Sequence, residues 1–134
     1  MRSKIVILIW LVSFLIGGCD SDDPIIACTT EFVILTISVE DNMGVPVVFD
    51  SVAVNRESDN FLYVFDVEIA FEPGTYILMT DKYFQDLSPD GTTILFSGYN
   101  DPNSLQLVAS YEYVVKKGIC HVEKVSGNDV IITP

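Results

Sequence analysis

Apolar and polar side chains alternate along most of the chain beyond residue 30. Val33, Leu35 and Ile37 are each separated by one residue, and the same period of two recurs over residues 105–115. That period is typical of a β-strand whose two faces meet different surroundings. No window of ten or more residues shows the three- and four-residue spacing of an amphipathic helix. The pattern predicts strands at residues 33–39, 47–55, 61–71 (one or two strands), 75–80, 92–98, 105–115, 120–125 and 130–133.

Turn-forming residues separate these segments at intervals of about 8–12 residues. Asp, Asn, Gly and Pro gather at residues 41–44, 72–74, 88–91, 100–103 and 126–128. The last of these segments, Ser-Gly-Asn, predicts a hairpin between the two C-terminal strands. About seven or eight short strands with no crossover helix predict an all-β fold, an antiparallel β-sandwich.

Two segments resemble the carboxypeptidase-regulatory-like, transthyretin-like domains. Residues 38–47, SVEDNMGVPV, look like the opening hairpin of those domains, and residues 72–76, EPGTY, look like their later Pro-Gly-Thr-Tyr corner. The two segments span about half of the predicted domain, and the part around Cys120 has no counterpart in the pattern. The resemblance implies an immunoglobulin-like or prealbumin-like sandwich without catalytic residues of its own. Such domains usually act as spacers, stabilisers or binding modules.

The N-terminus has a different pattern, a short basic segment followed by a stretch of apolar residues. Residues 5–16 are apolar except for Ser13. Twelve residues of helix span about 18 Å, whereas the hydrocarbon core of a bilayer is roughly 30 Å thick. The stretch is therefore too short for a comfortable transmembrane helix and typical of a signal peptide.

The segment LIGGC at residues 15–19 resembles the lipobox of bacterial lipoproteins. The resemblance implies that a peptidase cuts between Gly18 and Cys19, and that long acyl chains such as palmitate are attached to Cys19. Two or three chains anchor firmly, because each buried CH₂ contributes about 0.8 kcal/mol. The predicted organisation is a signal peptide at 1–18, a lipidated cysteine and acidic tether at 19–27, and a sandwich domain at 28–134. An ordinary secretory signal with an incidental cysteine is the alternative.

The tether is polar and acidic over residues 20–24. An acidic stretch behind the lipidated cysteine resembles a signal for display on the outer face of some Gram-negative cells. Asp at the second mature position resembles an inner-membrane retention signal in other groups. The density of acids favours the outer membrane of a Gram-negative bacterium and surface exposure, although a plain solubilising tether explains these residues equally well.

The charge of the predicted mature chain limits its partners. All nineteen acidic residues lie at or after Asp20, and removal of residues 1–18 leaves five basic ones, a net charge of −14. Nucleic-acid phosphates and anionic lipid surfaces both require a basic footprint, so neither is an expected partner. The charge fits a dispersed, soluble domain, and binding of a cationic ligand is the alternative.

Cys28 and Cys120 are the cysteines that remain after Cys19. An even pair in an exported chain is best explained by one disulfide, with two separate buried thiols as the alternative. A bond closing a loop of about 92 residues would stabilise the fold by roughly 4–5 kcal/mol in the chain-entropy model. It would hold the terminal strand close to the tether.

The candidate chemistry elsewhere is sparse. His121, the single histidine, has neither the ligand partners of a structural zinc site nor a recognisable nucleophile motif nearby, so we expect a strand histidine that faces solvent or a satisfied neighbour. No metal or cofactor site is expected. A weak calcium site near Asp101 and Asn103 stays open. Residues 50–52, Asp-Ser-Val, weakly resemble an O-glycosylation acceptor.

Three aromatic residues near predicted loop ends form a weak candidate binding patch: Tyr83, Phe84 and Tyr99. The sequence therefore favours a lipid-anchored, non-enzymatic cell-envelope protein whose sandwich binds a protein or glycan partner. One alternative is a structural accessory subunit of a surface complex without a ligand site of its own. Another is a carboxylate-based hydrolase, which requires two acids about 5–9 Å apart in a cleft.

We expect the protein made in its own host to begin at Cys19 and to carry fatty acid on that residue. Replacement of Cys19 by Ser removes the thiol, so the variant should keep its leader and gain no lipid. Mass spectrometry of the purified N-terminal peptide measures both. A mature N-terminus elsewhere, or an unacylated Cys19, would contradict the anchor.

Overall fold

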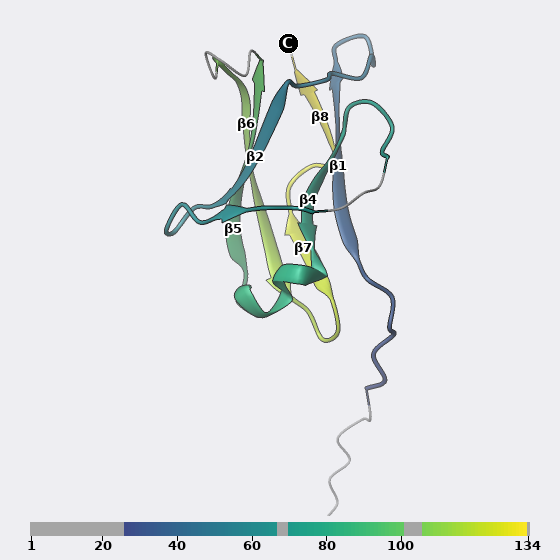
Figure 1. Ribbon diagram of the computed structural model, residues 1–134, viewed down its shortest axis with the longest axis vertical. Coiled ribbons are helices and arrows are strands. Elements are labelled where there is room, and N and C mark those ends of the chain that lie inside the picture. The colour runs from purple at the N-terminus through teal and green to yellow at the C-terminus, as the bar shows by residue number, and fades with distance from the viewer. Residues whose placement is uncertain (1–25, 67–69, 101–105, 134) are drawn as a thin grey trace, which may run out of the picture.

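The fold was analysed in a computed structural model that describes residues 26–66, 70–100 and 106–133, with residues 106–108 as backbone only. In this part the chain forms eight strands and one short 3-10 helix, stacked as two sheets (Figure 1), which confirms the predicted all-β sandwich. The elements are β1 (Ile34–Asp41), β2 (Ser51–Arg56), β3 (Leu62–Tyr63), β4 (Thr75–Thr80), η1 (Asp81–Asp86), β5 (Thr92–Asn100), β6 (Gln106–Lys117), β7 (Val122–Ser126) and β8 (Val130–Thr133).

The order of the central strands follows the immunoglobulin plan, and the C-terminal strands β7 and β8 depart from it. The smaller sheet has the order β4-β1-β8 and the larger one β3-β2-β5-β6-β7. Strands β3-β2-β5-β6 take the places of C′, C, F and G in a variable-type immunoglobulin domain, and β1 and β4 take those of B and E. Strand β8 lies beside β1 where the first strand A would lie, but it runs parallel to β1. The other strand pairs in the described residues are antiparallel.

The core lies between the sheets and is built by the period-two alternation. On β5, Ile94 and Phe96 point inward and are fully buried, while the residues between them face outward. The same holds for Ile37 and Val39 on β1. Each such side chain contributes about 1.5–3 kcal/mol when it leaves water, so register along these strands is strongly fixed.

The predicted C-terminal hairpin is wrong. Strand β7 pairs with β6 in the larger sheet, whereas β8 crosses to the smaller sheet and pairs with β1. The crossing passes over Tyr113: its hydroxyl donates to the Asn128 carbonyl at 3.0 Å, and a Cβ on Gly127 would lie 2.1 Å from its ring. The turn residues are present, but they redirect the chain between sheets instead of folding it back.

Two further segments differ from the predictions. Within residues 61–66 only Leu62–Tyr63 forms a strand, and residues 67–69 lie outside the described part. Residues 81–86 form η1, which the sequence pattern did not indicate. None of the described helical residues makes a helix long and apolar enough to cross a bilayer. The predicted signal peptide and Cys19 lie outside the described residues.

Two glycines with similar backbone angles allow a matched test of packing. Gly44 has a φ of +76° and Gly74 a φ of +79°. A Cβ at Gly44 would meet only the Glu40 carboxylate at 3.9 Å, but one at Gly74 would lie 2.8 Å from the Val39 carbonyl and 2.9 Å from Pro46. Gly44→Ala should cost about 1–2 kcal/mol for the left-handed backbone. Gly74→Ala should cost about 1–3 kcal/mol more, because the corner is overpacked. Urea unfolding of both variants measures the difference; equal losses would contradict this packing.

Candidate functional site

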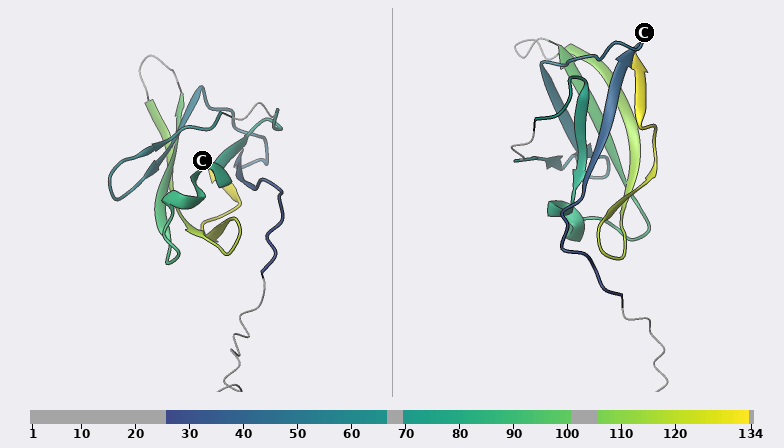
Figure 2. Two further views of the ribbon diagram at one scale, coloured as in Figure 1. Left: turned by 60° about the horizontal axis from the view of Figure 1, so that its bottom comes forward. Right: turned by 90° about the vertical axis from the view of Figure 1, so that its right-hand side faces the viewer.

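The segment that leads to the predicted tether meets the sandwich at one end. The N-terminal chain leaves at the end that carries η1 and the β6–β7 turn, and the C-terminus lies at the opposite end (Figures 1 and 2). We call the first end the base. The base holds a disulfide and a partly buried carboxylate, and two cavities lie elsewhere on the domain.

Cys28 and Cys120 form a disulfide at the base, with their Cα atoms 5.3 Å apart. The predicted bond is therefore present, and the alternative of two separate thiols does not hold. Cys28 precedes β1, and Cys120 lies in the turn between β6 and β7. The bond ties the N-terminal segment to the five-stranded sheet, although the following strand β1 belongs to the other sheet.

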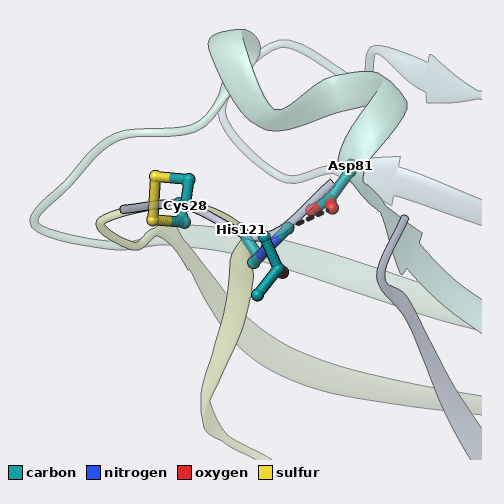
Figure 3. Close-up of a disulfide and its surroundings, with 5 residues drawn as sticks. Cys28, Asp81 and His121 are labelled. Atoms are coloured by element: carbon teal, nitrogen blue, oxygen red, sulfur yellow. Dashed lines mark hydrogen bonds and ion pairs between the residues drawn. A yellow bond between two sulfur atoms is a disulfide. The ribbon is translucent and has the colours of Figure 1, made fainter. Parts of the chain in front are cut away.

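Asp81 joins the same segments by hydrogen bonds (Figure 3). It is the first residue of η1. Its Oδ2 accepts from the Val33 amide at 2.9 Å and contacts His121 Nδ1 at 2.6 Å, and its Oδ1 accepts from the Val122 amide at 2.9 Å. The Asp81 amide donates in turn to the Val33 carbonyl at 3.1 Å. One carboxylate therefore connects the N-terminal segment, η1 and the start of β7.

Burial alone raises the pKa of Asp81, but the amide donors of Val122 and Val33, together with His121, outweigh it and lower the pKa below its usual value of 3.8. The group is therefore an anion at neutral pH. An ionised carboxylate only accepts hydrogen bonds, so Nδ1 of His121 carries the hydrogen.

The other imidazole nitrogen of His121 reaches Thr29, with Nε2 3.0 Å from Oγ1. Carboxylate, imidazole and hydroxyl thus follow one another as in a hydrolase triad. The lining of the two cavities described below includes neither Thr29 nor His121. We interpret the contact as structural: Thr29 and His121 each follow a disulfide cysteine and extend the cross-link by one residue. The predicted histidine with a satisfied neighbour is present, but it lies in the turn before β7 and not on a strand.

An apolar groove of about 400 Å³ opens at the side of the sandwich. It lies between β2 and β3 of the larger sheet and β4 of the smaller one, where β3 and β4 are the edge strands. Its walls include Val52, Leu62, Val64, Phe65, Phe71 and Ile77. Val52, Leu62 and Val64 are exposed. This volume falls in the range of small ligand sites, which is about 300–1,000 Å³. We name this cavity the side groove.

A second cavity of about 360 Å³ is polar, and we name it the polar cleft. Its walls come from the end of β2, the residues after η1 and the start of β5: Arg56, Glu57, Ser58, Asp86, Ser88 and Thr93. Arg56 holds one side of the cleft, since its guanidinium binds the Asp59 carboxylate at 2.8 and 2.9 Å and the Asp86 carbonyl at 3.2 Å. Most of its lining residues carry a hydrogen-bonding side chain, in contrast to the side groove.

The three aromatic residues predicted as a patch do not come together. Tyr83 is buried, and its hydroxyl donates to the Val64 carbonyl at 2.7 Å and accepts from the Val64 amide at 2.8 Å. Phe84 is half-buried beneath the ammonium of Lys117. Tyr99 lies near the other end of β5. It is seven residues from Thr92, where the strand begins, which corresponds to about 23 Å at the rise of a strand. Tyr83 instead supports the chain that forms the side groove.

Sequence reasoning missed the side groove. Five of its nine lining residues lie in the aromatic run 61–71, which the sequence pattern predicts as strand, and the spacing gives no sign that β3 ends after two residues. The Ser51 hydroxyl of the weak glycosylation motif is buried without a hydrogen-bond partner among the described residues, which argues against modification there. Asp101 and Asn103 lie outside the described part. Within that part, no group of three or more His, Cys, Asp or Glu side chains is placed to hold a metal.

Comparison with known proteins gives no relative: no family model, no curated protein and no solved structure matches the chain. The likeness to carboxypeptidase-regulatory-like domains therefore stays a prediction from two motifs.

The base allows a test of pH dependence. Because the pKa of Asp81 is lowered in the folded state, its stabilisation is complete above about pH 4 and is lost as the pH falls through the folded pKa. Asp81→Asn should cost about 2–3 kcal/mol at pH 7, as expected for bonds to a charged group. The cost should be smaller at pH 2 than at pH 7, because the pH has then fallen below the usual pKa of the carboxyl group and toward its lowered pKa in the folded state.

Urea unfolding at both pH values measures this cost, with Asp90→Asn in an exposed turn as the control, which should stay within about 0.5 kcal/mol of the parent. A loss for Asp81→Asn that did not change with pH would contradict a charged acceptor.

Proposed function

We propose that this protein is a lipid-anchored, non-enzymatic component of the cell envelope whose β-sandwich binds a protein or glycan partner. Acyl chains on Cys19 hold it to the membrane, in the outer membrane of a Gram-negative cell, with the domain facing outward. The observation that carries the proposal is the side groove, a concave apolar surface at the edge of an otherwise well-packed sandwich.

The geometry of the base supports a role as an anchored module. The segment that leads to the tether is held by a disulfide and by the hydrogen bonds of Asp81. A domain held at one end presents its sides and its opposite end to partners. Strand β4 lines the side groove with its first three residues, Thr75–Ile77, whereas the base follows its other end at Asp81.

The exposed apolar residues of the side groove make the fold less stable than if they were buried. Val64 is 52% exposed and Leu62 50%, and both lie beside buried aromatic rings. Apolar area left in water forgoes about 25 cal/mol per Å² of stabilisation, so a concave apolar patch is a common mark of a binding site. Groove and cleft differ in chemistry: the side groove suits apolar side chains of a protein, and the polar cleft suits hydroxyl-bearing ligands such as glycans.

The hydrolase alternative gains little support from the carboxyl groups. In a glycosidase pair the proton donor has a raised pKa. The two described acids whose pKa departs from its usual value are Asp59 and Asp81, and both are lowered, the first chiefly by its hydrogen bond to Arg56. Neither is held ready to donate a proton.

One feature favours the accessory-subunit alternative. Strand β8 is an edge strand without a charged residue, and its outward-facing Val130 and Ile132 are exposed. Edge strands are usually blunted by charge, proline or cover, because their free backbone groups pair with other chains. An accessory subunit would use such an edge for assembly.

A matched pair of variants tests the proposed function. Val64→Lys places a charge in the side groove, whereas Val125→Lys, at 54% exposure on β7, adds the same charge elsewhere. The lipidated protein, solubilised from its host and used as bait for envelope proteins and on a glycan array, should retain a defined partner that Val64→Lys loses and Val125→Lys keeps.

If the parent protein and both variants retain the partner, the binding surface lies on another face of the domain. If the parent protein retains neither an envelope protein nor a glycan, the proposal is contradicted.

A further inference from the structure

The side groove lies between two strand edges that no described strand covers. Strand β4 ends the order of the smaller sheet and β3 ends that of the larger sheet. Leu78, Met79 and Thr80 in the lower half of β4 are buried, but Thr75, Tyr76 and Ile77 in its upper half are partly exposed and line the groove. An edge strand carries a row of N–H and C=O groups, and an extended chain laid beside it completes the ladder.

The polar groups in the groove are few. The Tyr76 hydroxyl is occupied, since it donates to the Val47 carbonyl at 2.9 Å and accepts from the Phe49 amide at 2.7 Å. Tyr63 is only 3% exposed, and its hydroxyl has no hydrogen-bond partner among the described residues. A sugar needs many hydrogen bonds to its hydroxyls and finds little to bond here, so apolar side chains suit the groove better.

The charge of the domain determines whether a basic or an acidic segment is attracted to the side groove. Each of its five cationic side chains already has a partner in the described part of the chain. Arg56 binds Asp59, Lys82 binds Asp66, Lys116 binds Glu123, Lys124 binds Asp129, and Lys117 binds Gln85 above the Phe84 ring. Acidic groups are in large excess, and Glu72 is exposed directly beside the lining residue Phe71. A basic segment is therefore attracted, and an acidic one is repelled.

We infer that the side groove binds an extended segment of a partner protein in which apolar and basic residues alternate, and that this segment adds a strand along the edge of β4 from the Thr75 carbonyl to Ile77. The Thr75 amide takes no part, because it donates to the Glu72 carbonyl at 3.0 Å. A strand's period of two places the apolar side chains in the groove and the basic ones toward solvent and the acidic surface. The inference rests on the proposed function and specifies its partner class.

Synthetic seven-residue peptides test the inference directly. The probe alternates Lys and Val, one control alternates Glu and Val, and a second alternates Lys and Ser. Titrated into the isotope-labelled full chain in detergent micelles, the Lys-Val peptide should shift the amide signals of Val52, Val64 and Thr75–Ile77. The two controls should bind at least tenfold more weakly, because one has the wrong charge and the other lacks apolar side chains.

The same lysine variants distinguish binding of the peptide in the side groove from general attraction between opposite charges. Val64→Lys should weaken the Lys-Val peptide at least tenfold, and Val125→Lys by less than twofold. Peptides N-methylated on alternate amides separate strand addition from simple apolar contact. Methylation along the edge that faces β4 should abolish binding, and methylation along the other edge should leave it within about twofold.

Each contrary result overturns a stated part of the inference. Equal weakening by both lysine variants, or equal binding of the Lys-Ser peptide, reduces the effect to charge alone. Equal binding of the two methylated peptides rules out strand addition, and a glycan that shifts the groove signals where the peptides do not rules out the peptide class. If no peptide binds while Val64→Lys still loses an envelope partner, the proposed function stands and only the partner class is wrong.

Discussion

The carboxylate of Asp81 connects the N-terminal segment and η1, which continue the β1 and β4 strands of the smaller sheet, with the start of β7 in the larger sheet. It accepts the amides of Val33 and Val122 and contacts His121, and the disulfide from Cys28 to Cys120 lies beside it. In an immunoglobulin plan the first strand would secure the N-terminal segment through ladder bonds. Here β8 has taken that place, so the segment before β1 has no strand partner among the described residues. A covalent bond and one ionised side chain supply the attachment, at the end where a membrane tether would pull.

The sequence predicted the local features of the fold well because they depend on local patterns. Alternation located the strands of the core, and β4 and β8 have the predicted bounds. Cysteine parity and the prediction of export were enough to pair Cys28 with Cys120. The crossing at residues 127–129 was not predictable, because Ser-Gly-Asn suits a hairpin equally well. Its course depends on Tyr113, which precedes the turn by more than ten residues and meets it only in the folded chain.

Neither the contacts at the base nor the side groove could be predicted from the sequence, and the reason is the same for both. Asp81 and His121 are 40 residues apart, and the sequence gives no sign that they meet. Tyr83 lies in a short polar segment, DKYFQD, and was interpreted as an exposed loop aromatic. Its hydroxyl satisfies both backbone groups of Val64, which allows the ring to be buried and positions the chain that leaves β3. Because β3 is short, no strand of the described chain pairs with the edge of β4 beside the side groove.

An uncovered edge beside an apolar groove invites pairing between copies of the same chain, and the charge of this protein opposes it. With its five cations beyond residue 18 engaged and a formal net charge of −12 on the chain, two copies repel each other over distances comparable to the Debye length, about 8 Å at physiological ionic strength. The same surplus of acids attracts a basic segment. One charge distribution therefore keeps the edge of β4 free of self-pairing and favours an oppositely charged strand, which links the acidic composition of the chain to the selectivity of its groove.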